Sequence, residues 1–375
     1  MEAQKNELLQ KFELYGCFQC GKCTGGCPVS LKSNLNIRKL MIEVLLRENL
    51  GNMIQRDELW DCTTCKTCTL RCPRGLEPMD LLIGMRALSV EEGHIPKTII
   101  EALEGAYKYG NPWNAAKNKR SDWANELELK VFPQGGKAAN LYFVCCTAAY
   151  DTRVQNVGRS LVQCFRQIGY DFATLGNDET CCGSEIRRMG EQGLFELLME
   201  ENIESINKYD IRSIVTTSPH CYNTIKNDYG QDGLQVSHYT QVLAEAIKDK
   251  NPFSGEMRKT ITYHDPCFLG KQNGIFDEPR QILQSIPGVT FIDFDRSREK
   301  SLCCEGGGGR MWVESSDQGP RLAEIRVQDA VDMGAEILAT ACPFCLLTLE
   351  DAVKTTGNDE KLRVMDISEI LVEVL

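Results

Sequence analysis

The chain has 375 residues, of which 42% are hydrophobic and 25% charged, so it has enough apolar material for a buried core. Its 42 Lys and Arg residues against 53 Asp and Glu residues leave a net charge of −11, which argues against a nucleic-acid partner held through phosphates. No uncharged apolar run reaches the roughly 18 to 20 residues of a membrane span, and residues 1–16 lack a secretory signal. We therefore expect a cytoplasmic protein that is not integral to a membrane.

The 19 cysteines are the most informative feature of the composition. A secreted scaffold held by disulfides is usually a shorter chain with a higher fraction of cysteine. In a long chain with an ordinary core, many cysteines instead indicate metal ligation or redox chemistry, and their spacing distinguishes the two.

Residues 1–95 contain two copies of the pattern Cys-x2-Cys-x2-Cys-x3-Cys-Pro, separated by a predicted amphipathic helix at 34–49 and followed by another at 76–91. In this pattern three closely spaced cysteines bind one cluster and the fourth reaches the neighbouring cluster. The spacing therefore predicts two 4Fe–4S clusters with crossed ligands. The first is expected to take Cys17, Cys20, Cys23 and Cys72, and the second Cys62, Cys65, Cys68 and Cys27. Zinc is the alternative, but zinc prefers two closed pairs of ligands.

Residues 96–138 are expected to be a linker, which begins with a helix at 97–109 and continues as a polar stretch rich in Asn, Lys, Pro and Gly. The basic run formed by Lys117, Lys119 and Arg120 is interpreted as solvated surface.

From residue 139 onwards the sequence is duplicated, which divides it into segments 139–254 and 255–375. Each copy alternates strands with helices, and the first and last of its predicted strands lead directly into a cysteine motif. The strands are expected at 140–145, 170–174 and 211–217 and at 259–264, 289–292 and 337–341; the helices at 152–168 and 186–207 and at 277–286 and 320–333. This order predicts an α/β unit with a largely parallel sheet in each copy, and an α+β multidomain protein overall.

Each copy also carries five cysteines rather than the four that an ordinary cubane needs. In the second copy they are Cys267, Cys303, Cys304, Cys342 and Cys345, and in the first Cys145, Cys146, Cys181, Cys182 and Cys221. The glycine run at 306–309 is expected to bring backbone N–H groups close to cluster sulfides. His220 and His264 stand beside candidate ligands, and Cys164 is interpreted as a buried inert thiol.

Four segments carry a resemblance to a known family: ETCCG at 179–183, TYHDPC at 262–267, GGGRMW at 307–312 and TACPFC at 340–345. The N-terminal block resembles the C-type subunit of heterodisulfide reductase, the duplicated block resembles the B-type subunit, and their fusion is similar to the D-type subunit. The resemblance implies a noncubane 4Fe–4S cluster at the five thiols of the second copy, which in heterodisulfide reductases cleaves a disulfide.

The chain departs from the family pattern at three positions. Ser218 replaces a cysteine, Cys145 stands where the family usually has glycine, and Glu305 replaces the glycine that follows the cysteine pair. The first copy is therefore expected to hold an altered cluster or none. Glu305 is either a proton donor to the cluster or an obstacle to substrate.

Two redox functions and one non-redox function are consistent with these features. The leading hypothesis is an electron-transfer subunit of a multi-subunit redox complex, whose partner the resemblance suggests is a flavoprotein related to the A-type subunit of heterodisulfide reductase. The alternative is a catalytic disulfide reductase acting at Cys267, Cys303, Cys304, Cys342 and Cys345. The third is a zinc or interaction protein that merely retains cysteines.

Overall fold

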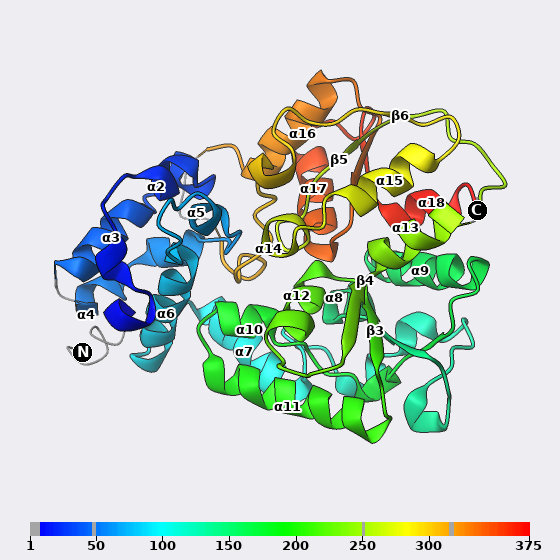
Figure 1. Ribbon diagram of the computed structural model, residues 1–375, viewed down its shortest axis with the longest axis horizontal. Coiled ribbons are helices and arrows are strands. Elements are labelled where there is room, and N and C mark those ends of the chain that lie inside the picture. The colour runs from blue at the N-terminus through cyan, green and yellow to red at the C-terminus, as the bar shows by residue number, and fades with distance from the viewer. Residues whose placement is uncertain (1–7, 47–49, 250–251, 315–318) are drawn as a thin grey trace.

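The computed structural model describes residues 8–46, 50–249, 252–314 and 319–375. In Figure 1 a helical N-terminal region lies on one side, and two α/β units lie beside it, the first below the second. The fold class expected from the sequence is therefore confirmed.

The N-terminal region consists of short helices around a core that includes Cys62, Cys65 and Cys68. Its helices are α2 (Lys22–Gly26), α3 (Ile37–Leu45), α4 (Leu50–Met53), α5 (Thr67–Leu70) and α6 (Pro78–Glu91), with 3-10 turns η1 (Leu14–Gly16), η2 (Val29–Leu31) and η3 (Asp57–Asp61). Helix α3 is shorter than predicted because Asn36 caps its start by accepting a hydrogen bond from the Lys39 N–H. The last three residues predicted for this helix, 47–49, lie outside the described residues.

The expected linker starts with helix α7 (Lys97–Tyr109), which has the predicted bounds. It continues through the short turns η4 (Lys117–Lys119), η5 (Asp122–Ala124) and η6 (Phe132–Gln134). Trp123 from this stretch is buried in the core that both α/β units share.

Two four-stranded parallel sheets confirm the duplication. The first has the order β2-β1-β3-β4, formed by β1 (Asn140–Phe143), β2 (Phe172–Ala173), β3 (Ser213–Thr216) and β4 (Gln235–His238). The second has the equivalent order β6-β5-β7-β8, formed by β5 (Thr260–Tyr263), β6 (Thr290–Phe291), β7 (Ile337–Thr340) and β8 (Arg363–Asp366). The central pairs are in register at Leu141 with Ile214 and at Ile261 with Ile337. Both sheets therefore present the carboxyl ends of their two central strands at one edge, where ligand sites of parallel sheets form.

Helices cover both sheets. The first unit contains α8 (Cys146–Tyr150), α9 (Gln155–Gln167), α10 (Ser184–Arg188), α11 (Gln192–Lys208), α12 (Pro219–Asn227), α13 (Tyr239–Asp249) and the turn η7 (Gly176–Asp178). The second contains α14 (Gly270–Asn273), α15 (Asp277–Ser285), α16 (Leu322–Asp332), α17 (Pro343–Thr355), α18 (Ile367–Val372) and the turn η8 (Arg298–Lys300).

The single helix predicted at 186–207 is wrong, because the chain breaks between α10 and α11. Gly190 lies in the break with φ +97°, a conformation that favours glycine. A Cβ atom there would lie 2.6 Å from the backbone of Arg86 and Ala87. The break thus lets the first α/β unit contact α6 closely.

Each unit packs its last helix against a helix of the other unit. Helix α13 of the first packs against α15 of the second, and α18 of the second packs against α9 of the first. The Tyr239 hydroxyl donates to Asp366 Oδ1 (2.8 Å) across this contact. One continuous core therefore joins the units and fixes their cysteine motifs relative to each other.

Candidate iron–sulfur sites

The two cysteine loops of the N-terminal region share one backbone geometry. In the first, Gln19 and Gly21 have positive φ angles (60° and 77°); in the second, Thr64 and Lys66 do (48° and 66°). These residues occupy equivalent places between the three closely spaced cysteines of each loop. The left-handed turns curl the chain around a common point, as a cluster-binding loop must.

The two loops differ in exposure. Cys62, Cys65 and Cys68 are each 8% exposed, whereas Cys20 is exposed and Cys17 and Cys23 are half-buried. Four large apolar side chains around the first loop also stand in solvent: Tyr15, Phe18, Leu31 and Leu70. The first cysteine set therefore faces solvent and the second faces the rest of the protein.

Cys27 lies with the second loop rather than with its own. Burial, together with the charge of Cys65, raises the pKa of Cys27. Burial and the neighbouring Cys27 also raise the pKa of Cys68, and that of Cys62 to about 12. Helix α2, which carries Cys23, packs against α5, which precedes Cys72. This arrangement is compatible with crossed ligand sets, which stay a prediction.

The five cysteines of the first α/β unit converge on one buried spot from the ends of β1 and β3 and from the loop after η7. Cys221 is hydrogen-bonded to both Cys145 and Cys182, and Cys146 to Cys181. Hydrogen bonds from Cys181 and Cys221 lower the pKa of Cys182 to about 6. Five soft thiol donors that share protons in this way can exchange those protons for iron.

Cys145 supplies the thiol that Ser218 does not. The Ser218 hydroxyl caps α12 by accepting a hydrogen bond from the His220 N–H (3.2 Å). Cys145 has φ 80° and ψ 143°, close to a region that is essentially restricted to glycine. A side chain is tolerated there, and its thiol is hydrogen-bonded to Cys221.

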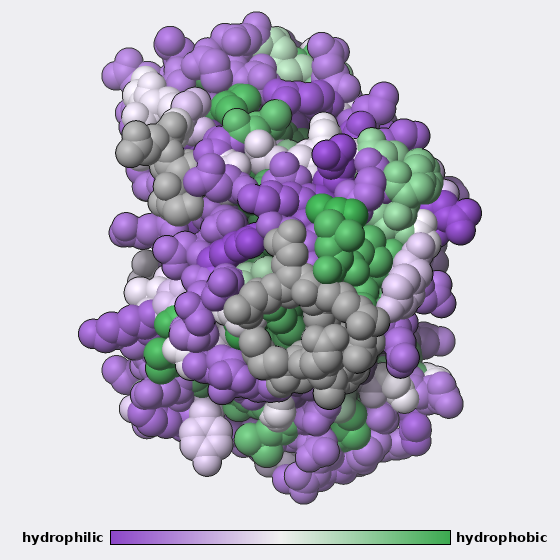
Figure 2. Space-filling model, turned by 90° about the vertical axis from the view of Figure 1, so that its left-hand side faces the viewer, coloured by the Kyte–Doolittle hydropathy of each residue, from purple (hydrophilic) through white to green (hydrophobic). Residues whose placement is uncertain are grey.

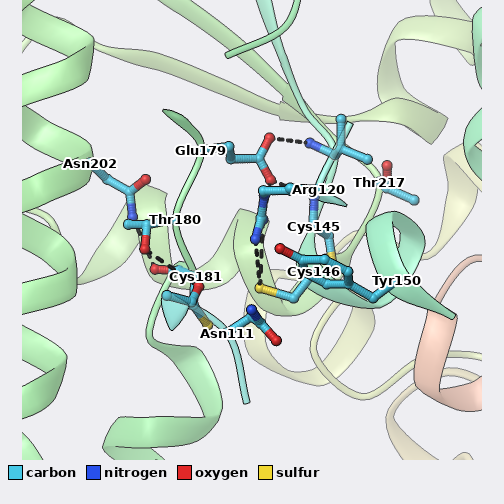
Figure 3. Close-up of polar contacts among 12 residues, drawn as sticks. Asn111, Arg120, Cys145, Cys146, Tyr150, Glu179, Thr180, Cys181, Asn202 and Thr217 are labelled. Atoms are coloured by element: carbon cyan, nitrogen blue, oxygen red, sulfur yellow. Dashed lines mark hydrogen bonds and ion pairs between the residues drawn. The ribbon is translucent and has the colours of Figure 1, made fainter. Parts of the chain in front are cut away.

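An arginine from the linker reaches this first thiol set (Figure 3). The Arg120 guanidinium donates to Cys146 Sγ at 3.5 and 3.6 Å and pairs with Glu179, and the Arg120 side chain is only 2% exposed. Glu179 also accepts from the N–H groups of Val144 and Cys145. The prediction that Arg120 is solvated surface is therefore wrong, whereas Lys117 and Lys119 are exposed as expected.

The five cysteines of the second unit converge in the same way. Cys303 is hydrogen-bonded to Cys267 and to Cys304, and Cys304 Sγ lies 3.1 Å from Cys345 Sγ. The His264 ring lies with Cys304 and Cys345, their candidate ligand atoms being within 4.8 Å of one another. Cys267 is the one partly exposed thiol of the five.

His220 belongs to the cysteine motif of the first unit, but its side chain contacts the cysteine set of the second. It is hydrogen-bonded to Cys342 and, at 2.8 Å, to Glu185, and it stacks on Phe268 with ring centroids 3.8 Å apart. Although burial alone would lower it, these hydrogen bonds raise the pKa of His220 to about 10. Burial alone would raise the pKa of Cys342, but hydrogen bonds from Cys345 and His220 lower it to about 6.

Glu305 is held away from free solvent by the N-terminal region. Its Oε1 lies 2.8 Å from Lys32 Nζ and its Oε2 accepts from the Leu322 N–H. Its φ of 70° matches the 78° of Gly183 at the equivalent position of the first unit. The backbone turn is thus the same in both copies, and the carboxylate forms an ion pair between the N-terminal region and the second unit.

The glycine run packs on the second loop of the N-terminal region. A Cβ at Gly308 would lie 2.6 Å from the Cys62 carbonyl oxygen, and one at Gly307 would lie 3.0 Å from that of Thr63. The Gly309 N–H donates to Glu185 Oε2 (2.7 Å). These glycines therefore allow two backbones to approach each other.

Several hydrogen bonds connect the N-terminal region to the second α/β unit. The Cys303 thiol donates to the Thr63 hydroxyl (3.3 Å), and Lys271 Nζ donates to the Thr67 hydroxyl (2.9 Å). The fully buried Arg86 donates to the carbonyl oxygens of Cys62 (2.8 Å) and Gly308 (2.9 Å). The second unit thus contacts the segment that carries Cys62, Cys65 and Cys68.

Two domain families match these parts of the chain. Residues 13–76 match the 4Fe-4S dicluster domain, and residues 140–226 and 261–350 each match the cysteine-rich domain called CCG. The D-type subunit of a dihydromethanophenazine:CoB–CoM heterodisulfide reductase from Methanosarcina barkeri is 34% identical over 313 residues, which are 80% of this chain and 74% of the relative. The chain belongs to this family of CCG-domain iron–sulfur proteins.

Other family members are longer. A probable iron-sulfur-binding oxidoreductase, FadF, from Bacillus subtilis is 35% identical over 79% of this chain. An EtfAB:quinone oxidoreductase from Syntrophomonas wolfei is 33% identical over 79% of it. The aligned part is only 44% and 43% of these two relatives, so the chain spans less than half their length. Among the residues that the structure describes, no helix is both long and apolar enough to cross a bilayer.

The residues present fit the clusters that the family implies. All 19 cysteines are free thiols, and 18 of them belong to the four sets named above. The remaining one, Cys164, is buried in α9 with its thiol 3.7 Å from the Ser368 carbonyl oxygen, as an inert thiol would be. Buried cations lie beside the sets, Arg86 near Cys62 and Arg120 against Cys146, where they offset thiolate charge.

Proposed function

We propose that the chain is an iron–sulfur electron-transfer subunit of a multi-subunit redox complex. Electrons would enter at the solvent-facing set of Cys17, Cys20, Cys23 and Cys72 and leave through the second α/β unit. Bound iron–sulfur clusters supply one-electron transfer. The observation that carries the proposal is the hydrogen bond between Cys303 and Thr63, the residue next to Cys62, because it links two cysteine sets directly.

Each cysteine set has an assigned role. Cys17, Cys20, Cys23 and Cys72 would hold one 4Fe–4S cluster, and Cys62, Cys65, Cys68 and Cys27 another. Cys267, Cys303, Cys304, Cys342 and Cys345 would hold a noncubane 4Fe–4S cluster, and Cys145, Cys146, Cys181, Cys182 and Cys221 an altered one. The protein residues around them exclude water and neutralise charge: Arg86, Arg120, Lys271 and His220 are all buried.

The surface around the first set suits a protein partner. Figure 2 views the molecule from this side, and green apolar side chains stand out there among purple polar ones. Tyr15, Phe18 and Leu31 are 69%, 61% and 72% exposed beside the exposed Cys20. Apolar side chains around an exposed redox site favour docking of a redox protein. We assign this surface to a flavoprotein partner.

The relay is tested by removing one cysteine set at a time. Cys20→Ser should remove the solvent-facing cluster, and Cys65→Ser the interior one. In anaerobic freeze-quench EPR with a reduced flavoprotein donor, either variant should abolish electron arrival at the second α/β unit while its own cluster remains assembled. Cys164→Ser is the matched control and should behave as the wild type. Unimpaired arrival in Cys20→Ser would contradict the proposed order.

Disulfide reduction at the second unit is a second candidate, favoured by two observations. Cys267 is partly exposed there, and His220, whose pKa is raised by hydrogen bonds to Cys342 and Glu185, lies against this cysteine set. The reduced protein mixed with 2-hydroxyethyl disulfide should release thiol if this candidate is correct. Absence of thiol release, with the relay intact, leaves electron transfer as the function.

A further inference from the structure

Arg86 of α6 is a fully buried cation whose hydrogen-bond acceptors are all neutral. Its five N–H groups donate to the carbonyl oxygens of Leu59 (2.7 and 3.0 Å), Cys62 (2.8 Å), Arg188 (3.0 Å) and Gly308 (2.9 Å). Every donor is therefore used on the backbone, and none is left for a carboxylate. A buried charge is costly unless an opposite charge lies close by, so the guanidinium calls for an anion near this loop.

Lys271 of α14 is a second buried cation with neutral partners at the same loop. It is 6% exposed, and its Nζ donates to the Thr67 hydroxyl (2.9 Å) and to the Ser301 carbonyl oxygen (2.7 Å). The Thr67 hydroxyl in turn lies 3.3 Å from Cys65 Sγ. Arg86 contacts this loop at its first cysteine, so two buried cations from different elements meet one cysteine loop.

The negative charge that acts most strongly on Arg86 is that of Cys62. Burial lowers the pKa of Arg86, and Cys62 opposes this more than Glu185 or Asp61 does. Both carboxylates are paired with other basic side chains. Burial likewise raises the pKa of Cys62 to about 12, and the charge of Arg86 is the largest influence against this rise. The anion that Arg86 faces is therefore the cysteine set itself.

The cations beside the first loop have a different environment from those at the interior set. The interior set consists of Cys27, Cys62, Cys65 and Cys68. Arg38 lies against Gly21 and Arg71 against Gly26 of the first loop, and both arginines are exposed. Water and salt screen exposed charges much more than buried ones. Their effect on the solvent-facing set is therefore weaker than that of the two buried cations on the interior set.

We propose that Arg86 and Lys271 raise the reduction potential of the interior cluster above that of the solvent-facing cluster. A reduced cluster carries one more negative charge than an oxidised one, so a buried cation beside it favours reduction. Burial of the cluster and the net charge of −11 act in the opposite direction. This role of the two cations rests on the proposed relay and gives it a direction, because electron transfer inward is then downhill.

An electrostatic role of Arg86 can be separated from a structural one. Its acceptors lie in the N-terminal region and in both α/β units, so it also joins three parts of the chain. A structural role needs the hydrogen bonds, whereas an electrostatic role needs the charge. Arg86→Lys keeps the charge and loses most of the hydrogen bonds, and Arg86→Met loses both.

The test is an anaerobic redox titration, followed by EPR, of the cluster-loaded Cys20→Ser protein, in which the interior cluster is the remaining N-terminal one. In this background Arg86→Met and Lys271→Met should each lower the midpoint potential of the interior cluster. We expect about a tenfold change in the reduction equilibrium, which is about 59 mV for one electron. Arg86→Lys should stay close to the parent protein. The matched control is Arg326→Met, which removes a fully buried arginine that stacks on Phe294 and should leave the midpoint unchanged.

Three results would overturn the proposal. One is an unchanged midpoint in both Arg86→Met and Lys271→Met, and another is an equal shift in Arg86→Lys and Arg86→Met. The third is an interior cluster in Cys20→Ser with a lower midpoint than the solvent-facing cluster in Cys65→Ser. If the Arg86 variants do not fold, the midpoint of Lys271→Met decides. Failure of the relay itself is distinguishable, because the interior set would then give no iron–sulfur signal at all, and the role of the cations would fall with it.

Discussion

The backbone at Cys145 allows a sharp test of the first thiol set. Its φ of 80° and ψ of 143° place a residue with a side chain where glycine is normally required. If that side chain had no role, replacing it with glycine would relieve strain and stabilise the protein. If the thiol is a cluster ligand in place of the missing cysteine at position 218, the same replacement should remove iron.

The two effects of Cys145→Gly have opposite signs. Relief of the backbone strain is worth about 1 to 3 kcal/mol in favour of the folded state. Against this, the variant loses a buried thiol hydrogen-bonded to Cys221, and a neutral hydrogen bond is worth about 1 kcal/mol. For the protein without iron, we therefore expect the variant to be as stable as the wild type or up to about 2 kcal/mol more stable.

Iron content and stability, measured on the same preparations, decide between the two roles. We expect Cys145→Gly to lose the iron of one cluster per chain, with the EPR signals of the other three sets unchanged, while urea denaturation of the iron-free protein shows no loss of stability. Cys164→Gly is unsuitable as a control because it lies inside a helix, so Cys164→Ser is used. Full iron content in Cys145→Gly would refute a ligand role for Cys145.

Three further predictions concern buried charges. Arg120→Gln leaves the Glu179 carboxylate buried without its partner, so urea denaturation should show a loss of about 3 to 5 kcal/mol; a loss below about 1 kcal/mol would mean that the pair is solvated. Lys32→Met and Glu305→Gly break the same ion pair, but the glycine also relieves a left-handed backbone at position 305. Lys32→Met should therefore lower the free energy of unfolding by about 1 kcal/mol more than Glu305→Gly does. Equal losses would exclude strain at Glu305. Burial raises the pKa of Asp366 from 3.8 to about 7, so its contribution to stability is complete below pH 4 and is lost as pH rises through 7. In Asp366→Asn this loss should be absent from the pH dependence of Tm, and an unchanged pH profile would show that Asp366 does not cause it.

Local sequence patterns were sufficient to predict the duplication, and the predicted cysteine sets also rest on local patterns. The spacing of Cys62, Cys65 and Cys68 is read over a few residues, and the left-handed turns at Thr64 and Lys66 follow from that spacing. The central strands β1, β3, β5 and β7 are short runs with β-branched or aromatic residues that lead into a cysteine motif, so their parallel order could be expected. The edge strands β4 and β8 have no such mark and were not predicted. Helix α7 was predicted with its observed bounds because Pro96 and Gly110 mark its two ends.

Contacts between distant segments could not be predicted in this way. Arg120 stands in a run with two exposed lysines, and its sequence neighbours give no sign that it is buried against Cys146. His220 is next to Cys221 in the sequence, yet its ring is hydrogen-bonded to Cys342 of the other unit. In both cases the local pattern is uninformative because the partner lies more than twenty residues away.

The two α/β units share one topology, and they differ in what packs over their thiol sets. The N-terminal region covers the second unit, which accounts for three of its features: the Thr63 contact to Cys303, the glycines that admit Cys62, and Glu305 as partner of Lys32. The linker covers the first unit, and Arg120 is its contribution. A duplicated fold can thus place one thiol set beside the N-terminal cysteine loops and leave the other aside, since the covering segments, rather than the sheets, decide which set those loops contact.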